Sequence, residues 1–309
     1  MKNQIRNERR LLCILMLILV TATATACANH TQADEAVPIV DTGVDPDAWV
    51  TIPAGEFLSG QHEHPAMIEA DYEMMATLVT NEQYEEFVNA ALDSGDVRIV
   101  DGAVVAFYPG DPFHGQRHEK EIAAGDKPLM PLETPGLRLR FDGAAFAVEQ
   151  GYENHPATMV SWFGAYAYCR YYDWRLPTDL EWEKAARGTD NRPYPWGHEP
   201  TDARANFLDS QDPFEGSSET TPVGFYNGNV YEGYATQDGA SPYGVYDMVG
   251  NVWEWTGEDH WGSHDRSLRG GSYANYPYNL RIWSHNAADP SHMSPRVGFR
   301  CVRDTRGTP

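Results

Sequence analysis

The sequence predicts an α+β protein in which a few helices and strands accompany long stretches of ordered but irregular backbone. Capping-box spacings at Thr80–Gln83 and Thr178–Glu181 each precede a run with helical periodicity, while Thr51–Gly60 alternates polar and apolar residues as a short strand does. Beyond Gly188 neither helical periodicity nor the alternation of a strand is found, and Gly, Asn, Pro and aromatic residues dominate. Eight of the nine Trp nevertheless lie between positions 162 and 283, so we expect an ordered core there that ions or disulfides stabilise.

The remaining local signals place the elements along the chain. Apolar residues recur at helical intervals after Thr80, at Tyr84, Phe87, Val88 and Ala91. Residues 93–154 are rich in Gly and Pro, and we expect an irregular insertion there with room for one hairpin. The expected elements are, in order, a strand over 51–60, a helix after Thr80, a helix over 162–172 capped by Ser161, and a helix from Asp179 to Gly188.

The composition is that of a folded, acidic and aromatic-rich chain. Its 309 residues carry 23 Lys and Arg against 45 Asp and Glu, for a formal charge of −22. Nine Trp, seventeen Tyr and eleven Phe require burial, which excludes a disordered acidic protein, and a mean hydropathy of −0.53 excludes a polytopic membrane protein. Nucleic acid is not an expected partner, because an acidic surface repels phosphate. Solubility explains most of the charge, although some carboxylates are available to hold cations.

The N-terminus has the three regions of a secretory signal peptide, which we place at residues 1–26. Four basic residues precede the apolar run Leu11–Val20, which is shorter than the roughly 20 residues of a transmembrane helix. Ala24–Cys27 resembles a bacterial lipobox, in which the cysteine is diacylated, so Cys27 is the expected lipidation site. Leu is usual where Ala24 stands, which leaves ordinary cleavage as the alternative. We therefore expect an exported protein, anchored to a membrane in the periplasm or at the cell surface, or free in the periplasm.

A flexible acidic tether is expected at residues 27–48. Residues 28–50 contain five acids, two prolines and no Lys or Arg, a composition that cannot bury a core. Removing the signal peptide removes four basic residues and one acid, which takes the formal charge from −22 to −25. We place the folded domain at residues 49–303 and a short tail at 304–309.

The cysteines are consistent with an oxidising compartment. Cys13 leaves with the signal peptide and Cys27 is the lipidation candidate, so Cys169 and Cys301 remain as an even pair. Exported proteins favour a disulfide for such a pair, and two buried free thiols are the alternative. A CxxC zinc motif is absent from the sequence.

Several short segments together resemble the formylglycine-generating enzyme, or sulfatase-modifying factor, family. They are 79–84 (VTNEQY), 175–188 (RLPTDLEWEKAARG), 244–255 (GVYDMVGNVWEW), 269–272 (RGGS) and 298–301 (GFRC). Their order and spacing fit a single domain. The resemblance implies an elaborated C-type-lectin-like α+β fold with little regular secondary structure, and it also implies that Cys169 pairs with Cys301.

The resemblance implies two calcium ions that stabilise the irregular loops. One site is implied at the side chains of Asn206 and Asp212 with the backbone carbonyls of Phe207 and Phe214. The other is implied at the carboxylates of Asp247 and Glu254 with the carbonyls of Gly250 and Val252. Such mixed oxygen sets suit Ca²⁺, while a turn-capping role is the alternative for each aspartate.

The catalytic cysteines of the family do not carry over to this sequence. The oxidase uses two cysteines shortly after its Gly-Gly-Ser motif, where they bind copper and oxidise a substrate thiol. Here Asn275 stands at the first position and Asn279 or Leu280 at the second, and none of these can supply the thiolate that Cu(I) selects. Sulfatase activation is therefore not expected. The candidates for lining the equivalent pocket are Trp253, Ser272, Asn275, Arg281 and His285, with a core role for Trp253 and an ion pair for Arg281 as the structural alternatives.

Histidine spacings give only weak signals for a redox metal. Some family relatives, the sulfoxide synthases, hold iron on His-x-x-x-His-x-Glu, and the nearest string here is His114 to Lys120, in which Lys120 replaces the glutamate. His62 and His64, and His260 and His264, also have possible metal spacings, but no partner is fixed by sequence. Solvated loop histidines are the preferred interpretation.

Two classes of function follow. The first is a calcium-stabilised cell-envelope module with a degenerate formylglycine site, which binds a glycan, an envelope protein or a small substrate. The second is an exported iron- or copper-dependent oxidoreductase, of the sulfoxide-synthase or pyoverdine-maturation type, that acts on a peptide or small metabolite. The lipid anchor, the tether and the missing cysteines favour the module.

Overall fold

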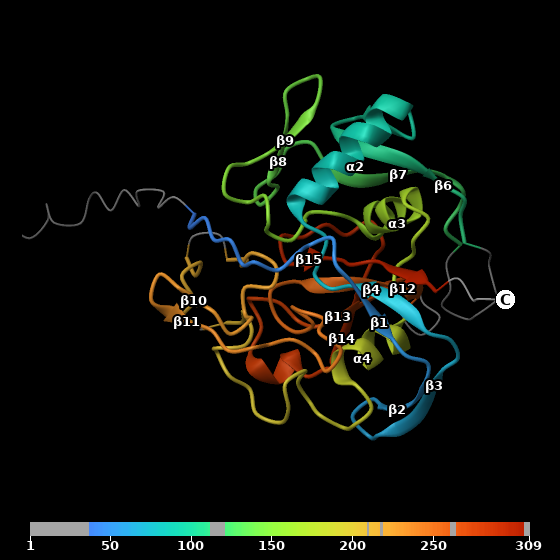
Figure 1. Ribbon diagram of the computed structural model, residues 1–309. Helices are drawn as coiled ribbons and strands as arrows, with labels where there is room; N and C mark the ends of the chain where they lie inside the picture. The colour runs from blue at the N-terminus through green and yellow to red at the C-terminus, as the bar shows by residue number, and fades with distance from the viewer. Residues whose placement is uncertain (1–36, 112–120, 209, 217–218, 260–263, 306–309) are drawn as a thin grey trace, which may run out of the picture. The chain divides into compact units, whose positions relative to one another are not determined.

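The computed structural model describes residues 37–111, 121–208, 210–216, 219–259 and 264–305 (Figure 1). These residues belong to one compact unit that begins at Val37. None of the helices in these ranges has the length and apolar character needed to cross a membrane. The predicted signal peptide, Cys27 and residues 306–309 of the tail lie outside the described residues.

Helices are few and strands are short, which confirms the predicted α+β class with little regular secondary structure. The helices are α2 (Asn81–Ser94), α3 (Trp162–Tyr171), α4 (Asp179–Arg187) and the 3-10 turn η1 (Pro277–Leu280). The strands are β1 (Trp49–Ile52), β2 (Gly55–Ser59), β3 (His64–Ile68), β4 (Tyr72–Met75), β5 (Val97–Val100), β6 (Ala103–Tyr108), β7 (Gly125–Pro131), β8 (Leu139–Phe141), β9 (Phe146–Val148), β10 (Val230–Tyr231), β11 (Tyr234–Ala235), β12 (Trp253–Asp259), β13 (Arg266–Arg269), β14 (His285–Ala288), β15 (Val297–Gly298) and β16 (Val302–Asp304).

Small sheets surround the buried aromatic core. The four-stranded sheet has the order β14-β13-β12-β15, in which β12 and β15 run parallel, and both α3 and α4 pack against β12 (Figure 1). An antiparallel sheet of order β1-β4-β16 joins the start of the domain to its end. The expected strand over Thr51–Gly60 is divided into β1 and β2, and Pro53, which has no N–H to donate to a ladder, lies at the break.

The helix caps are those that the sequence predicts. Thr80 and Thr178 each accept a hydrogen bond from the backbone N–H three residues later, and Gln83 and Glu181 bond back to the cap residue. Ser161 caps α3 by accepting from the Gly164 N–H at 3.0 Å. These bonds satisfy backbone donors that a helix start would otherwise leave unpaired.

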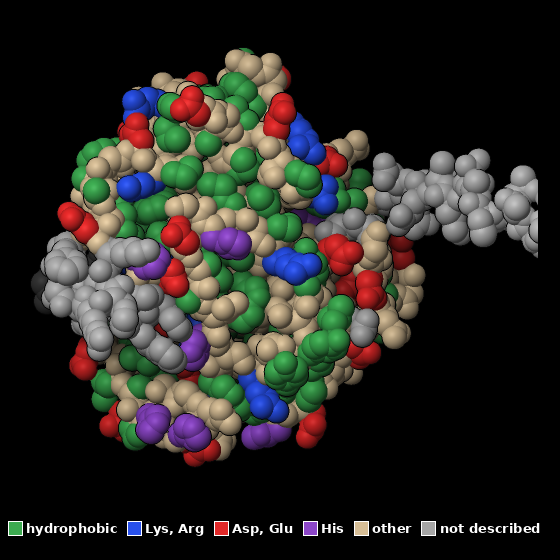
Figure 2. All heavy atoms as spheres, turned by 180° about the vertical axis from the view of Figure 1, so that it is seen from behind, with side chains coloured by type: hydrophobic (Ala, Val, Ile, Leu, Met, Phe, Trp, Pro, Cys, Tyr) green, Lys and Arg blue, Asp and Glu red, His purple; other side chains and the backbone are tan. Residues whose placement is uncertain are grey.

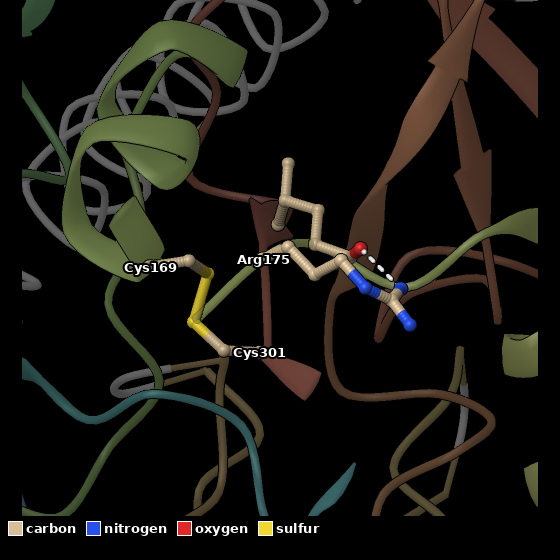
Figure 3. Close-up of a disulfide and its surroundings, with 4 residues drawn as sticks. Cys169, Arg175 and Cys301 are labelled. Carbon is tan, nitrogen blue, oxygen red and sulfur yellow. Dashed lines mark hydrogen bonds between the residues drawn. A yellow bond between two sulfur atoms is a disulfide. The ribbon is translucent and has the colours of Figure 1, made fainter. Parts of the chain in front are cut away.

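Cys169 and Cys301 form a disulfide (Figure 3) with a Cα–Cα distance of 5.7 Å and a sequence separation of 132 residues. Both cysteines are fully buried. The bond ties α3 to the backbone between β15 and β16, and Figure 3 shows Arg175 nearby. The backbone N–H of Arg175 donates to the Val302 carbonyl at 3.0 Å. The predicted pairing is confirmed, and the alternative of two free thiols is excluded.

The predicted tether is wrong for residues 37–48, which pack onto the domain. The side chain of Thr42 is buried and donates to the Val223 carbonyl at 3.1 Å, and Asn227 donates to the Thr42 carbonyl at 2.9 Å. Val37 and Val40 pack against a cluster that contains Phe225. A few valines and the backbone therefore order this acidic segment, and the folded domain begins at Val37 rather than at Trp49.

The expected irregular insertion at residues 93–154 is more regular than predicted. It contains the antiparallel sheet β5-β6-β7 and the hairpin β8-β9. Asp101 and Gly102 join β5 to β6 with φ angles of 48° and 79°, the left-handed conformations that a two-residue hairpin turn requires. This Asp-Gly pair between two runs rich in β-branched residues is a sequence signal that predicts the hairpin.

Candidate aromatic binding site

A groove of about 750 Å³ opens beside η1 and is walled mainly by aromatic and proline side chains. We call it the aromatic groove, and its lining residues are Pro193, Tyr194, His198, Glu199, Pro200, Tyr276, Pro277, Tyr278, Arg281 and Trp283. Its volume falls in the range of ligand-binding clefts, which combine apolar walls with a few polar groups.

The groove is built on a loop that is anchored underneath and exposed on top. Leu280 is 1% exposed and packs in the core, whereas Tyr276 and Tyr278 are 57% and 60% exposed. The buried Tyr194 donates its hydroxyl to the Pro277 carbonyl at 3.1 Å and so holds the η1 backbone. Two tyrosine rings are therefore presented to solvent from a fixed backbone. This lowers the conformational entropy that the loop loses when a ligand binds.

Asn275 closes the turn that leads into the groove. Its side-chain oxygen accepts hydrogen bonds from the backbone N–H of Ser272 at 2.9 Å and from the Ser272 hydroxyl at 2.8 Å. Its own carbonyl accepts from the Leu208 N–H at 3.0 Å. The Ser272 side chain is 1% exposed, so neither residue presents a free reactive group. The turn is a structural support for the tyrosines that follow it.

The guanidinium of Arg281 lines the groove beside Trp283. The guanidiniums of Arg281 and Arg187 lie 5.9 Å and 5.4 Å from the ring centroid of Trp283. Arg187 is fully buried and paired with Glu183 at 2.9 Å, whereas the exposed Arg281 forms no ion pair among the residues that the structure describes. The ion-paired alternative for Arg281 is therefore not observed. An exposed guanidinium beside an aromatic wall favours a ligand that carries a carboxylate or sulfate.

Nearly the whole described domain matches one protein-family model. The model of the "Sulfatase-modifying factor enzyme 1-like domain" matches residues 37–305. The chain belongs to the sulfatase-modifying factor family. It is 30% identical over 323 aligned positions to the formylglycine-generating enzyme of Mus musculus, covering 90% of this chain and 82% of that one. It is also 35% identical over 155 positions to the inactive C-alpha-formylglycine-generating enzyme 2 of Bos taurus, covering 48% and 50%.

Solved structures agree with the fold of the sulfatase-modifying factor family. PvdO from Pseudomonas aeruginosa superposes with a TM-score of 0.53 at 20% identity, covering 85% of this chain and all of that one. CarF superposes with a TM-score of 0.50 at 22% identity, covering 84% and 99%. The expected elaborated C-type-lectin-like fold is thereby confirmed, and at this identity the likeness shows the fold alone.

The structure separates the five pocket candidates of this sulfatase-modifying factor domain. Only Arg281 lines the aromatic groove, while Ser272 and Asn275 form the turn that leads into it. Trp253 is partly buried on β12 against the main core, as its structural alternative predicts. His285 is exposed on β14, where it pairs across the sheet with Arg269.

The first calcium set of the family maps onto a loop whose aspartate is already satisfied by protein donors. The Asp212 carboxylate accepts from the Phe214 N–H at 2.9 Å, the Ser210 hydroxyl at 2.7 Å and the Tyr226 hydroxyl at 3.1 Å. The Asn206 amide donates to the Glu219 carbonyl at 2.7 Å. The bond to the Phe214 N–H is the turn-capping contact that the alternative predicts. Three protein donors thus stabilise the Asp212 carboxylate.

The second calcium set places two acidic residues close together beside one arginine. Glu254 and Arg300 are both buried and form a two-pronged ion pair with N–O distances of 2.7 Å and 2.9 Å. The Asp247 carboxylate accepts one bond from the Gly224 N–H at 2.7 Å. Burial raises the pKa of Asp247 to about 6, and repulsion from Glu254 adds to this rise. Among the described residues, Arg300 forms an ion pair with Glu254 and none with Asp247. Two carboxylates beside a single guanidinium leave a negative charge that fits a hard cation.

Glycine brings the loops of the two predicted calcium sets into contact. Gly250 has a φ of 81°, and a Cβ built on it would lie 2.3 Å from the Asn206 carbonyl oxygen. The next residue, Asn251, donates its backbone N–H to that carbonyl at 2.8 Å. Any side chain at position 250 would force the loops apart, which explains glycine at this position of the family motif.

The histidine spacings are not supported by additional ligands. His62 and His64 are exposed with ring centroids 6.3 Å apart, and His264 lies 3.4 Å from Asp265. Across the described ranges, which exclude 112–120 and 260–263, no three His, Cys, Asp or Glu side chains are grouped to hold a metal ion. His114, His118 and His260 lie outside the described residues.

Sequence reasoning missed most of the aromatic groove. The string Tyr276-Pro277-Tyr278 directly follows the position of the family's first cysteine, and two exposed aromatic residues around a proline are a signal that could have been noted. Trp283 follows this string by five residues, whereas Tyr194 joins it only through the fold, because it lies 83 residues before Pro277 along the chain.

Proposed function

We propose that this protein is a non-catalytic binding module of the sulfatase-modifying factor family and that the aromatic groove is its ligand site. The observation that carries the proposal is the loop after Gly-Gly-Ser, where a closed Ser272–Asn275 turn leads into two exposed tyrosines. In the family's oxidase this loop holds reactive thiols. In this protein the same loop presents exposed tyrosines that can bind a ligand.

The number and pairing of the cysteines support a degenerate formylglycine site. The chain has four cysteines, and the two within the described domain, Cys169 and Cys301, are joined to each other in the core. Thiol oxidation on copper requires thiolate ligands, which the residues at positions 275, 279 and 280 cannot provide. The relative named inactive C-alpha-formylglycine-generating enzyme 2 is consistent with a family member that has lost this chemistry.

The ligand that best matches the groove is a glycan with an acidic sugar. Sugar rings present flat C–H faces that stack on aromatic side chains, and Tyr276 and Tyr278 offer such rings to solvent. Arg281 adds a guanidinium that can donate paired hydrogen bonds to a carboxylate or sulfate. The N-terminal signal and the lipobox-like Cys27 support a location in the cell envelope, where such glycans are found.

Removing the two exposed tyrosines is expected to weaken glycan binding strongly. The double variant Tyr276→Ala/Tyr278→Ala should bind at least about tenfold more weakly, because aromatic anchors contribute more than 1.4 kcal/mol at binding surfaces. Arg281→Gln should weaken binding of acidic glycans only. An array of neutral, uronic-acid and sulfated glycans, followed by calorimetric titration of the hits, measures both effects.

Tyr171→Ala is the matched control, since Tyr171 is an exposed tyrosine outside the groove. It should bind as the wild type does. Absence of glycan binding in the wild type, or binding that the groove variants leave unchanged, would contradict the proposal. Capture of a protein segment that the same variants abolish would replace the glycan with a protein ligand.

We further propose that calcium binds at Asp247 and Glu254 with the carbonyls of Gly250 and Val252 and stabilises the domain. Excess EGTA should then lower the melting temperature by about 5–10 °C relative to calcium at about 100 times its Kd, where ligand binding adds about 2.7 kcal/mol. Asp247→Asn should remove this difference, whereas Asp212→Asn should retain it. Differential scanning calorimetry of the three proteins decides, and an unchanged wild-type melting temperature in EGTA would refute the calcium assignment.

A further inference from the structure

A second pocket lies in the other half of the domain, far along the chain from the aromatic groove. It has a volume of about 470 Å³ and lies between α2, the β5-β6-β7 sheet and α3, which gather at the top of the view in Figure 1. Its walls include Phe87, Val97, Leu129, Phe163 and Tyr166. We call it the α3 pocket.

The α3 pocket is an open, ready-made apolar cavity. Its wall residues Phe87 and Phe163 are 1% and 3% exposed and belong to the main core, so the floor of the pocket is rigid. Phe107 and Tyr171, which also line it, are 68% and 39% exposed and stand at its mouth. A volume of this size with mainly aromatic walls suits a compact apolar body such as an aryl or short alkyl group.

One cation lines this pocket, and a second lies near its aromatic wall. Arg170 lines the pocket and is exposed, and the Lys127 ammonium lies 5.9 Å from the centroid of the Phe163 ring. Within the described ranges, neither side chain forms an ion pair or a side-chain hydrogen bond. The Arg170 guanidinium is therefore available to pair with an anionic group of a ligand.

The acidic residue at the same pocket sets a limit on the ligand charge. Asp96 lines the pocket and is exposed, and its carboxylate accepts from the Ser94 hydroxyl at 2.6 Å. A ligand with one negative charge can pair with Arg170, whereas a second negative charge would be repelled by Asp96. A ligand with an apolar body and a charged amine would be repelled by Arg170 and Lys127.

We infer that the α3 pocket binds a small monocarboxylate with an aryl or alkyl body, whose apolar part packs against Phe163 and whose carboxylate pairs with Arg170. Paired N–H donors of the guanidinium match the two oxygens of a carboxylate. The site shares no lining residue with the aromatic groove, so this inference stands independently of the proposed function.

Three probes with the same apolar body test the inference: 4-phenylbutyrate, 4-phenylbutan-1-ol and 4-phenylbutylamine. Isothermal titration and ligand-observed NMR on the whole protein should show saturable binding of the carboxylate, about tenfold weaker binding of the alcohol, and the weakest binding of the amine. Arg170→Gln should reduce carboxylate affinity to that of the alcohol. Ala167→Phe, which adds a ring to the pocket wall, should abolish binding of all three.

Arg98→Gln is the matched control. Arg98 is an exposed arginine on β5 that is paired with Asp126 and does not line the pocket. It should leave all three affinities unchanged. The inference is overturned if none of the probes binds saturably, if the amine binds as tightly as the carboxylate, or if Arg170→Gln has no more effect than Arg98→Gln. Arg170 is exposed, so this variant decides the matter even if Ala167→Phe does not fold.

Discussion

Glu254→Gln is expected to lower the free energy of unfolding by about 3–5 kcal/mol, because it leaves a buried guanidinium without its counter-ion. Glu254 and Arg300 are 1% and 0% exposed, and two hydrogen bonds of 2.7 Å and 2.9 Å join them. Arg300 also donates to the Tyr246 carbonyl at 2.9 Å, so it cannot turn toward water without breaking a further bond. Urea denaturation at equilibrium measures the loss.

The surface pair between Glu73 and Arg303 provides the control. Its side chains are 29% and 38% exposed, and Glu73→Gln should cost less than about 1 kcal/mol. Both variants should be measured in EGTA and in calcium, because Glu254 is also a proposed calcium ligand. In EGTA, where no calcium is bound, Glu254→Gln should still lower the free energy of unfolding, because Arg300 remains buried without its counter-ion. Similar small losses for the two variants would show that the buried pair is not needed for stability.

Removing the disulfide is expected to cost about 4–5 kcal/mol on the chain-entropy model, because the bond closes a loop with a sequence separation of 132 residues. The double variant Cys169→Ala/Cys301→Ala tests this with both thiols removed, so that no buried reactive sulfur remains. Its urea midpoint should fall far below that of the oxidised wild type.

Reduction offers an independent check of the same bond. Both sulfurs lie in the core, so dithiothreitol should leave the folded protein oxidised and act only when denaturant opens the domain. Labelling of free thiols as a function of urea follows this opening. Stability of the double variant within 1 kcal/mol of the wild type would contradict the stapling role assigned to the disulfide.

Much of the fold follows from local signals in the sequence. Thr80, Ser161 and Thr178 define the helix starts because a cap depends on residues only three positions away. The pairing of Cys169 with Cys301 could be predicted because these two cysteines remained for one bond in a chain that the sequence predicts to be exported. The Asp101-Gly102 hairpin also had a local signal, which the Gly and Pro content of its surroundings outweighed.

The remaining features depend on contacts between distant segments. Thr42 is buried only because Val223 and Asn227 come to it from about 180 residues away, so composition alone suggested a tether. The Glu254–Arg300 pair joins residues 46 positions apart. Tyr276 and Tyr278 are exposed while Leu280, two residues further on, is buried in the core, and a sequence without periodicity does not reveal this difference.

The central claim is that this family member binds a ligand and performs no metal-based oxidation. Metal analysis of the mature protein purified without chelators, combined with oxygen-electrode measurements on candidate thiols and phenols, tests it most directly. We expect calcium as the bound metal, copper and iron far below one equivalent, and no oxygen uptake above the rate without protein. About one equivalent of copper or iron together with protein-dependent oxygen uptake would contradict the account and establish an exported oxidoreductase.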